Sequence, residues 1–204
     1  VNGAVGSLRY HVGVHTEGGH SYGRFGNQNA IQTLSSMINT LYSYKVPKPG
    51  KSTYNVGTIS GGTSINTIAQ YAEMLFEYRS DVRESLASMN EFFLSVIESY
   101  RHMDNVQVDL ELLGERPCTG DVDQSKQDAL VNKALDIIEN YTGKRVELES
   151  GSTDCNIPLS VGVPAICFGG HMGVGAHTRG EHLNIKDLHA GMKIVAAFMM
   201  TYFE

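Results

Sequence analysis

The order in which strand-like and helix-like apolar patterns follow one another constrains the first half of the sequence most strongly. Residues 7–16 alternate, with Tyr10, Val12 and Val14 on one side and two histidines on the other, as in a strand buried on one face. Three later segments alternate in the same way, and two segments place apolar residues at helical spacing. The predicted strands span 7–16, 52–60, 71–79 and 106–113, and the predicted helices span 27–44 and 81–102.

This order, β-α-β-β-α-β, is that of a ferredoxin-like or split βαβ unit. We therefore predict that residues 1–113 fold as a four-stranded antiparallel sheet with two helices on one face. The segment VPKPG at 46–50 ends the first helix, because proline cannot continue the helical hydrogen-bond ladder.

The remaining residues, 114–204, carry a different pattern. A helix is predicted over 124–142, a short strand over 145–149 and a closing helix over 188–203. The run PAICFGG at 164–170 is continuously apolar, which is typical of a strand buried on both faces of a sheet. Two strands are too few for an independent sheet, so we expect this region to be part of a larger α/β domain.

Composition excludes several classes of protein. Hydrophobic residues make up 41% of the 204 residues, enough for a packed core. The formal net charge of −6, without a basic stripe, argues against a nucleic-acid partner, and no apolar run approaches the ~20 residues that span a membrane. Cys118, Cys155 and Cys167 show no C-x-x-C spacing, so we expect reduced thiols in a cytoplasmic protein.

A glycine-rich segment, TEGGHSYGRFGNQNAI at 16–31, places His20 between a predicted strand and a predicted helix. Glycines permit close approach of the backbone to a ligand, although a histidine that only hydrogen-bonds its own turn fits equally well. The segment GGTSINTIAQYAEMLFEYRS (61–80) contains Asn66 and Arg79, and two interpretations of them are open. Both side chains can face a ligand, or they can belong to a turn and a half-buried strand without contacting a ligand.

Two further clusters lie in the second half. Ser152, Thr153 and Asp154 suit a helix N-terminus, where they either cap the helix or leave backbone N–H groups free to bind an anion. The segment GGHMGVGAHTRGEHLN (169–184) is rich in histidine, a common metal ligand, but a surface loop with incidental histidines fits as well. Its histidines are His171, His177 and His182.

Four segments, taken in order, resemble the co-catalytic zinc exopeptidase and aminoacylase family, which includes peptidase T, bacterial glutamate carboxypeptidase and carnosinase-like dipeptidases. They are GGHSYGRFGNQNAI, GGTSINTIAQYAEMLFEYRS, GSTDCNIPLSVGVPAICFGG and GAHTRGEHL, and the resemblance extends over essentially the whole chain. That family has a zinc-binding catalytic domain interrupted by a ferredoxin-like lid, which usually also forms the dimer. The resemblance implies that residues 1–113 are the lid and 114–204 the C-terminal portion of the catalytic α/β domain.

The resemblance also implies roles for single residues. His20 matches the lid histidine that reaches the scissile carbonyl, and His177 matches the terminal histidine of the metal site. Arg116 is a candidate partner of a substrate carboxylate, because a guanidinium fork matches a carboxylate; a strand-end salt bridge is the other interpretation. The residues expected to bind substrate are Asn66, Arg79, Arg116 and Asp154.

The implied activity is hydrolysis of an amide bond in a small peptide or N-acyl amino acid by a homodimer, with water activated by two divalent ions, expected to be zinc. The family's other metal ligands, an H-x-D, a bridging Asp and a Glu-Glu pair, precede the lid, and this chain begins about where the lid begins. We therefore expect the chain alone to hold zinc poorly and to be inactive, since a catalytic zinc normally has three protein ligands. The alternative is a non-catalytic dimerisation or binding module.

Overall fold

The structure is a computed structural model that describes residues 1–171, 173–176 and 178–202. Within these ranges, no helix combines the length and apolarity needed to cross a membrane.

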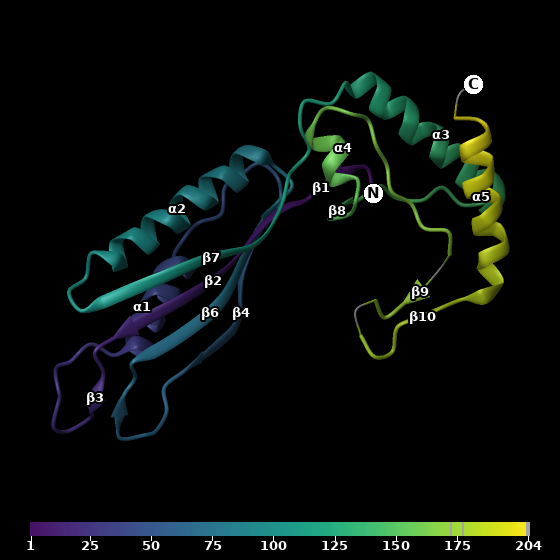
Figure 1. The fold of residues 1–204 in the computed structure, drawn as a ribbon. Coiled ribbons are helices and arrows are strands. Elements are labelled where there is room, and N and C mark those ends of the chain that lie inside the picture. The colour runs from purple at the N-terminus through teal and green to yellow at the C-terminus, as the bar shows by residue number, and fades with distance from the viewer. Residues whose placement is uncertain (172, 177, 203–204) are drawn as a thin grey trace. The chain divides into compact units, whose positions relative to one another are not determined.

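The chain forms two compact units (Figure 1). The sheet unit comprises Val5–Cys118. The helical unit comprises Val1–Ala4 together with Thr119–Glu204. The chain therefore leaves the helical unit after four residues and returns to it after the sheet unit is complete.

The sheet unit has the predicted ferredoxin-like topology. Its strand order is β4-β6-β2-β7, every neighbouring pair is antiparallel, and α1 and α2 cover one face (Figure 1). All four predicted strands and both predicted helices are confirmed, and the last strand continues to Arg116. The bounds are β2 (Gly6–Thr16), α1 (Ala30–Tyr42), β4 (Ser52–Gly61), β6 (Tyr71–Ser80), α2 (Arg83–Arg101) and β7 (Val106–Arg116).

The ends of the two helices follow from local chemistry. Asn29 begins α1, and its Oδ1 accepts the backbone N–H groups of Ile31 and Gln32, which would otherwise lack a partner in the first turn. Helix α2 has no side-chain cap. Glu84 in its first turn and Arg101 in its last turn instead complement the helix dipole.

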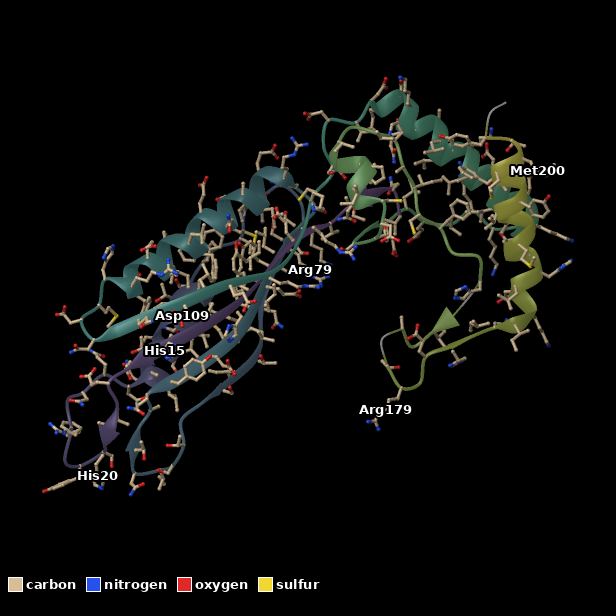
Figure 2. All side chains as sticks on the ribbon, in the orientation of Figure 1. His15, His20, Arg79, Asp109, Arg179 and Met200 are labelled. Atoms are coloured by element: carbon tan, nitrogen blue, oxygen red, sulfur yellow. The ribbon has the colours of Figure 1, made fainter. Side chains whose placement is uncertain are left out.

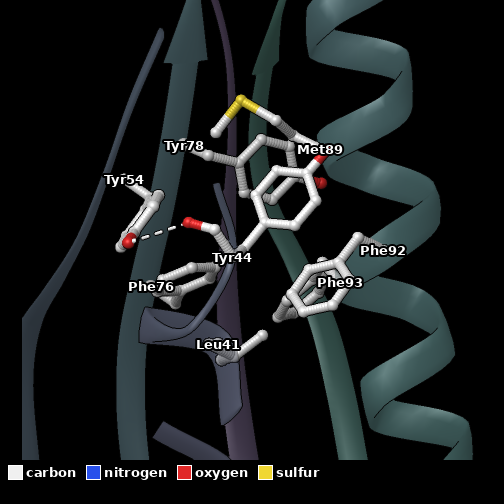
Figure 3. Close-up of a pocket in the computed structure, with 8 residues that line it drawn as sticks. All are labelled: Leu41, Tyr44, Tyr54, Phe76, Tyr78, Met89, Phe92 and Phe93. Atoms are coloured by element: carbon white, nitrogen blue, oxygen red, sulfur yellow. Dashed lines mark hydrogen bonds between the residues drawn. The ribbon is translucent and has the colours of Figure 1, made fainter. Parts of the chain in front are cut away.

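The apolar face of the sheet packs against the helices through a cluster of aromatic rings. Phe93 of α2 is buried, and its ring centroid lies 4.7 Å from that of Tyr10, 5.3 Å from Phe76 and 5.8 Å from Tyr78. Figure 3 shows the surroundings of Phe76 and Phe93. Asn90 accepts hydrogen bonds from the hydroxyls of Tyr10 and Tyr78, so the polar ends of these buried rings are satisfied.

The helical unit is built around α3 (Gln124–Thr142), which contacts α5 (Leu188–Met200). The helix predicted over 124–142 is confirmed at both ends. It begins at Asp123, whose side chain accepts two backbone N–H groups, and it ends at Gly143 with φ 71°, a left-handed conformation that glycine adopts readily. The other elements are β1 (Gly3–Ala4), β8 (Ser150–Gly151), α4 (Asn156–Ser160), β9 (Gly173–Val174), β10 (His182–Leu183) and the 3₁₀ turn η1 (Ile185–Asp187).

Two strands predicted in this unit are wrong. Residues 145–149 form no strand, and the nearest one is β8, which pairs in parallel with β1. Residues 164–170 form no strand either, despite their continuous apolarity.

The backbone of segment 164–170 finds other partners. Val1 and Cys167 exchange two hydrogen bonds, of 2.7 and 2.9 Å. The side chain of Gln127 donates to the carbonyl of Ala165 and accepts its N–H, both at 2.9 Å. An apolar run forms a strand only where a second strand offers backbone hydrogen-bond partners. Here the partners are the side chain of Gln127 and the backbone of Val1.

Gln127 supplies a first test. It is buried and also donates to the carbonyl of Asn2 at 3.1 Å, so Gln127→Leu would leave buried backbone groups unpaired. We expect the free energy of unfolding to fall by about 1–3 kcal/mol in urea denaturation. Gln124→Leu, at an exposed position of the same helix, should change it by less than about 0.5 kcal/mol. Equal effects of the two substitutions would contradict this role.

Candidate functional site

His20 lies at one end of the sheet unit (Figure 2), where its loop meets the loop that holds Asn66. The short strands β3 (Gly19–His20) and β5 (Thr67–Ile68) join these loops as an antiparallel pair. Beside this pair, the N–H of Ser21 donates to the carbonyl of Asn66 at 2.9 Å. We call this end, residues 17–29 and 61–68, the tip.

The loop around His20 is ordered by its own hydrogen bonds. Asn27 Nδ2 donates to the carbonyl of Gly18 at 2.7 Å, and the N–H of Arg24 donates to the carbonyl of His20 at 2.9 Å. Gly18 and Gly19 have φ values of 61° and 135°, which residues with a side chain rarely adopt. The glycines before His20 are therefore needed for the loop conformation.

The ring of His20 is exposed and has one defined tautomer when neutral. The N–H of Gly23 donates to its Nδ1 at 3.3 Å. A ring nitrogen that accepts a hydrogen bond carries no proton, so the neutral ring is protonated at Nε2. The tip thus presents an N–H donor to solvent.

Arg79 and Arg116 lie at the opposite end of the sheet. They are the cross-strand neighbours of Ser7 on β6 and β7, so all three residues face away from the helices. At about 3.4 Å per residue, Arg79 is about 27 Å from Tyr71, which begins the same strand near the tip. The structure places the two arginines on either side of Ser7, and it places Arg79 and His20 at opposite ends of the sheet unit (Figure 2).

Glu77 binds two arginine side chains at this end of the sheet. Its Oε2 accepts hydrogen bonds from Arg79 Nη2 and Arg9 Nε, both at 3.2 Å. Burial raises the pKa of Glu77, but the hydrogen bonds and charges of the two arginines outweigh it, so this pKa lies below its ordinary value. Arg79 Nε is buried and has no hydrogen-bond partner in the part of the chain that is described. Among the described residues, the Nε–H group of this guanidinium is therefore left without an acceptor.

The same face of the sheet carries a polar network that the sequence did not single out. His11 Nε2 and the hydroxyl of Tyr71 each lie 2.7 Å from Glu73 Oε2, and Ser60 donates to Oε1 at 2.9 Å. Hydrogen bonds from His11, Tyr71 and Ser60 lower the pKa of Glu73 to about 2, and the bond to Glu73 raises the pKa of Tyr71 to about 12. Periodicity assigns each residue to a face, but only the strand register shows that they meet.

A neighbouring pair extends this network. His15 Nε2 lies 2.9 Å from Asp109 Oδ2, and the rings of His15 and Tyr71 are 4.7 Å apart. Hydrogen bonding from Gln107, and then the proximity of His15, lower the pKa of Asp109. Because these groups bond to one another across the strands, we assign them to stabilising the exposed face rather than to binding.

Asp154 is exposed in the turn before α4. The helix begins at Asn156 after Cys155, which makes no side-chain capping bond, so the cap predicted within 152–154 is wrong. Thr153 instead closes a local turn: its N–H donates to Asn156 Oδ1 at 2.8 Å, and its Oγ1 accepts the N–H of Cys155 at 3.3 Å. A helix of five residues offers little dipole to an anion.

His177, the predicted metal ligand, lies outside the described residues. The hairpin of β9 and β10 holds His182, whose Nδ1 lies 2.7 Å from the carbonyl of Gly180. Across the described ranges, no three His, Cys, Asp or Glu side chains gather as a group that could hold a metal ion. These residues by themselves do not fit a metal centre, and no metal-dependent step is assigned to them.

The sequence contains one His-x-Asp spacing, at His102 and Asp104. Both residues are exposed, and they lie in the turn after α2 rather than at the end of a strand. We therefore do not assign this pair to the strand-end H-x-D of the family.

Comparison with known proteins adds independent information. Residues 2–101 match the family described as the peptidase dimerisation domain, and no curated protein matches the sequence. Aminopeptidase PepT from Bacillus cereus is 20% identical, with a TM-score of 0.69, over 97% of this chain and 52% of its own. A tripeptidase from Staphylococcus aureus is 19% identical, with a TM-score of 0.69, over 96% of this chain and 51% of its own.

A putative aminohydrolase from methicillin-resistant Staphylococcus aureus shares the fold at 15% identity, with a TM-score of 0.70, over 100% of this chain and 54% of its own. The chain thus spans about half the length of the solved proteins that it matches. At these identities the solved structures establish the fold, while the family match identifies the first half of the chain by its sequence. Residues 2–101 therefore are a peptidase dimerisation domain of the exopeptidase and aminoacylase family that the motifs of the chain resemble.

Proposed function

We propose that the complete protein hydrolyses the amide bond of a small peptide or N-acyl amino acid. The sheet unit would be the lid, and the helical unit the C-terminal portion of the catalytic domain. One observation carries the proposal: an ordered loop presents His20 Nε2–H as an exposed donor beside Asn66. Two divalent ions, for which we expect zinc and to which His177 would contribute, would activate the attacking water.

His20 would stabilise the charge that develops on the carbonyl oxygen when water adds to the amide. A donor aimed at that oxygen lowers the barrier more than it tightens substrate binding. The bond from Gly23 to Nδ1 fixes the proton on Nε2 before substrate arrives, so little reorganisation is needed. Asn66 Oδ1 accepts from Ser64 Oγ at 3.0 Å, which leaves the amide nitrogen of Asn66 as a second donor for the substrate.

Arg79 and Arg116 would bind the substrate carboxylate, and Asp154 would line the cleft. A dipeptide spans only about 7 Å, whereas Arg79 lies about 27 Å along its strand from the tip end. His20 and Arg79 of one chain therefore cannot contact the same small substrate. If both act on one substrate, two copies of the chain must contribute them.

Strand β4 is the edge through which we propose that the homodimer forms. Its ten residues, STYNVGTISG, carry no charged side chain, and such an edge is open to pairing with a second copy. The other edge, β7, has its Val108 carbonyl occupied by Arg101 Nε at 3.2 Å. Charges that oppose self-pairing also lie along β7: Asp109, Glu111, Glu115 and Arg116.

A charge on β4 should weaken the dimer. Ile59 is 55% exposed on β4, and Leu112 is 49% exposed on β7, so lysine substitutions at these positions form a matched pair. We expect Ile59→Lys to raise the dimer dissociation constant at least about tenfold, equivalent to about 1.4 kcal/mol, in sedimentation analysis of the 204-residue chain. Leu112→Lys should leave it unchanged; the reverse result would assign the interface to β7.

His20→Ala in the complete protein should lower kcat far more than it raises KM, because the interaction is made mainly in the transition state. Loss of one oxyanion donor typically lowers kcat by about 10²–10³. Bound metal should be unchanged, which metal analysis of the same sample would check.

His102→Ala is the matched control, since His102 is an exposed histidine of the same unit. It should leave kcat and KM at their wild-type values. A kcat for His20→Ala within about threefold of wild type, far short of an oxyanion-donor effect, would mean that His20 only orders its turn.

The second candidate function, a non-catalytic dimerisation or binding module, is favoured by the match of residues 2–101 to a dimerisation domain. We expect the 204-residue chain to bind zinc weakly in calorimetric titration and to cleave no dipeptide, because His177 is the single ligand that the resemblance assigns to it. Stoichiometric micromolar binding with turnover would show that the ligands are misassigned. The complete protein separates the two functions, since only the enzyme would turn over peptides.

A further inference from the structure

Three large apolar side chains at the tip are almost completely exposed. Tyr22 is 91% exposed, Phe25 93% and Ile65 102%, the highest values among the large apolar side chains that the structure describes. Single exposed apolar residues are common on protein surfaces, but a group at one end of a domain usually marks a binding surface.

A hydrogen bond between the two tip loops brings the backbones of two of these residues near each other. The β3–β5 pairing ends at His20 and Thr67, and beyond it the N–H of Ser21 donates to the carbonyl of Asn66. Tyr22 and Ile65 each lie one residue beyond this bond. Their backbones are therefore neighbours at the tip, although they are far apart in sequence.

The third residue, Phe25, follows a turn in the same loop. The N–H of Arg24 donates to the carbonyl of His20, so the chain turns directly before Phe25. The side chain of Arg24 packs over Gly19, where an added Cβ would lie 2.9 Å from its Cβ and Cγ. Its aliphatic stem therefore lies against the backbone of the loop.

The loop is ordered while its apolar side chains are exposed. Hydrogen bonds from Asn27 to Gly18 and from Gly23 to His20 Nδ1 fix its conformation. A loop that is already ordered loses little conformational entropy when it binds a ligand, so apolar contacts made by it contribute efficiently to affinity. These exposed apolar side chains on an ordered loop therefore favour binding of an apolar group.

We propose that Tyr22, Phe25 and Ile65 form an apolar wall that receives a large apolar side chain on the carbonyl side of the scissile amide. This inference rests on the proposed function of His20. Two residues of chain span at most about 7 Å, so the backbone of Tyr22 lies within that distance of His20. If His20 donates to the scissile carbonyl, the side chain of the residue that bears this carbonyl is the substrate group nearest the wall.

The substrate class follows from this placement. Preferred substrates carry leucine, methionine or phenylalanine, or an apolar acyl group, on the carbonyl side. The arginines of a second copy of the chain would bind the carboxylate, so the wall and those arginines would contact different parts of the substrate.

The test uses the complete protein and two dipeptides, Leu-Gly and Gly-Gly, which share the terminal carboxylate and differ in one side chain. We expect Tyr22→Ala, Phe25→Ala and Ile65→Ala each to lower kcat/KM for Leu-Gly about tenfold or more. Their kcat/KM for Gly-Gly should stay within about twofold of wild type, because glycine has no side chain for the wall to contact. Tyr141→Ala, at a 47% exposed position on α3, is the control and should change neither value.

The melting temperature checks that the variants fold, and it should shift by less than about 2 °C since the side chains bury almost nothing. Equal losses on both dipeptides would show that the wall docks the lid rather than selecting substrate, and wild-type values on both would show that it does not face the substrate. Either result overturns the inference.

His20→Ala assayed on Gly-Gly separates this inference from the proposed function. If its kcat falls while the wall variants do not discriminate, the function stands and the wall is wrong. If its kcat is unchanged, His20 is not at a scissile carbonyl and both are wrong.

Discussion

The register of β2 against its two neighbours is the constraint on which the rest of the sheet unit depends. β2 is paired along nearly its whole length with β6 on one side and β7 on the other. A slip of one residue would move Tyr10, Val12 and Val14 from the core to the solvent and turn Arg9 and His11 toward the helices. That cost holds the strands in one alignment, and the contacts of His11 with Glu73 and of His15 with Asp109 follow from it.

The same alignment places two groups of polar side chains at opposite ends of the sheet unit. The tip carries His20 and Asn66 on loops joined by a two-residue strand pair. The other end carries Arg79 and Arg116 on either side of Ser7. A sheet does not bend enough to bring its ends together, so a reaction that uses both ends on one small substrate needs a second chain. The uncharged edge β4 offers a way to supply it.

Hydrogen bonds from polar side chains support both units. In the sheet unit, Glu73 gathers three side chains on the exposed face, and its low pKa of about 2 reflects these hydrogen bonds, the one from His11 above all. In the helical unit, Gln127 takes the place of a neighbouring strand for Ala165. In both cases a side chain satisfies polar groups that would otherwise weaken the structure.

Local sequence patterns were enough to predict most helices and strands, because helices and strands have different periods. The alternation in 7–16 and 71–79 specified strands with one buried face, and the stripe in 124–142 specified a helix with both of its ends. The glycine-rich segment around His20 was predicted between a strand and a helix, and Gly18 and Gly19 in it have positive φ. Four short motifs, read in order, indicated the family.

Features that depend on two distant segments required the three-dimensional structure. The run 164–170 has the composition of a strand, but it forms none; Val1 pairs with Cys167, and a side chain, Gln127, pairs with Ala165. The placement of Arg79 and Arg116 on either side of Ser7 depends on strand register, and the exposure of Phe25 depends on how the tip loop folds. Periodicity reports which face a residue occupies, whereas the partner on that face is set by long-range pairing, which leaves no local pattern in the sequence.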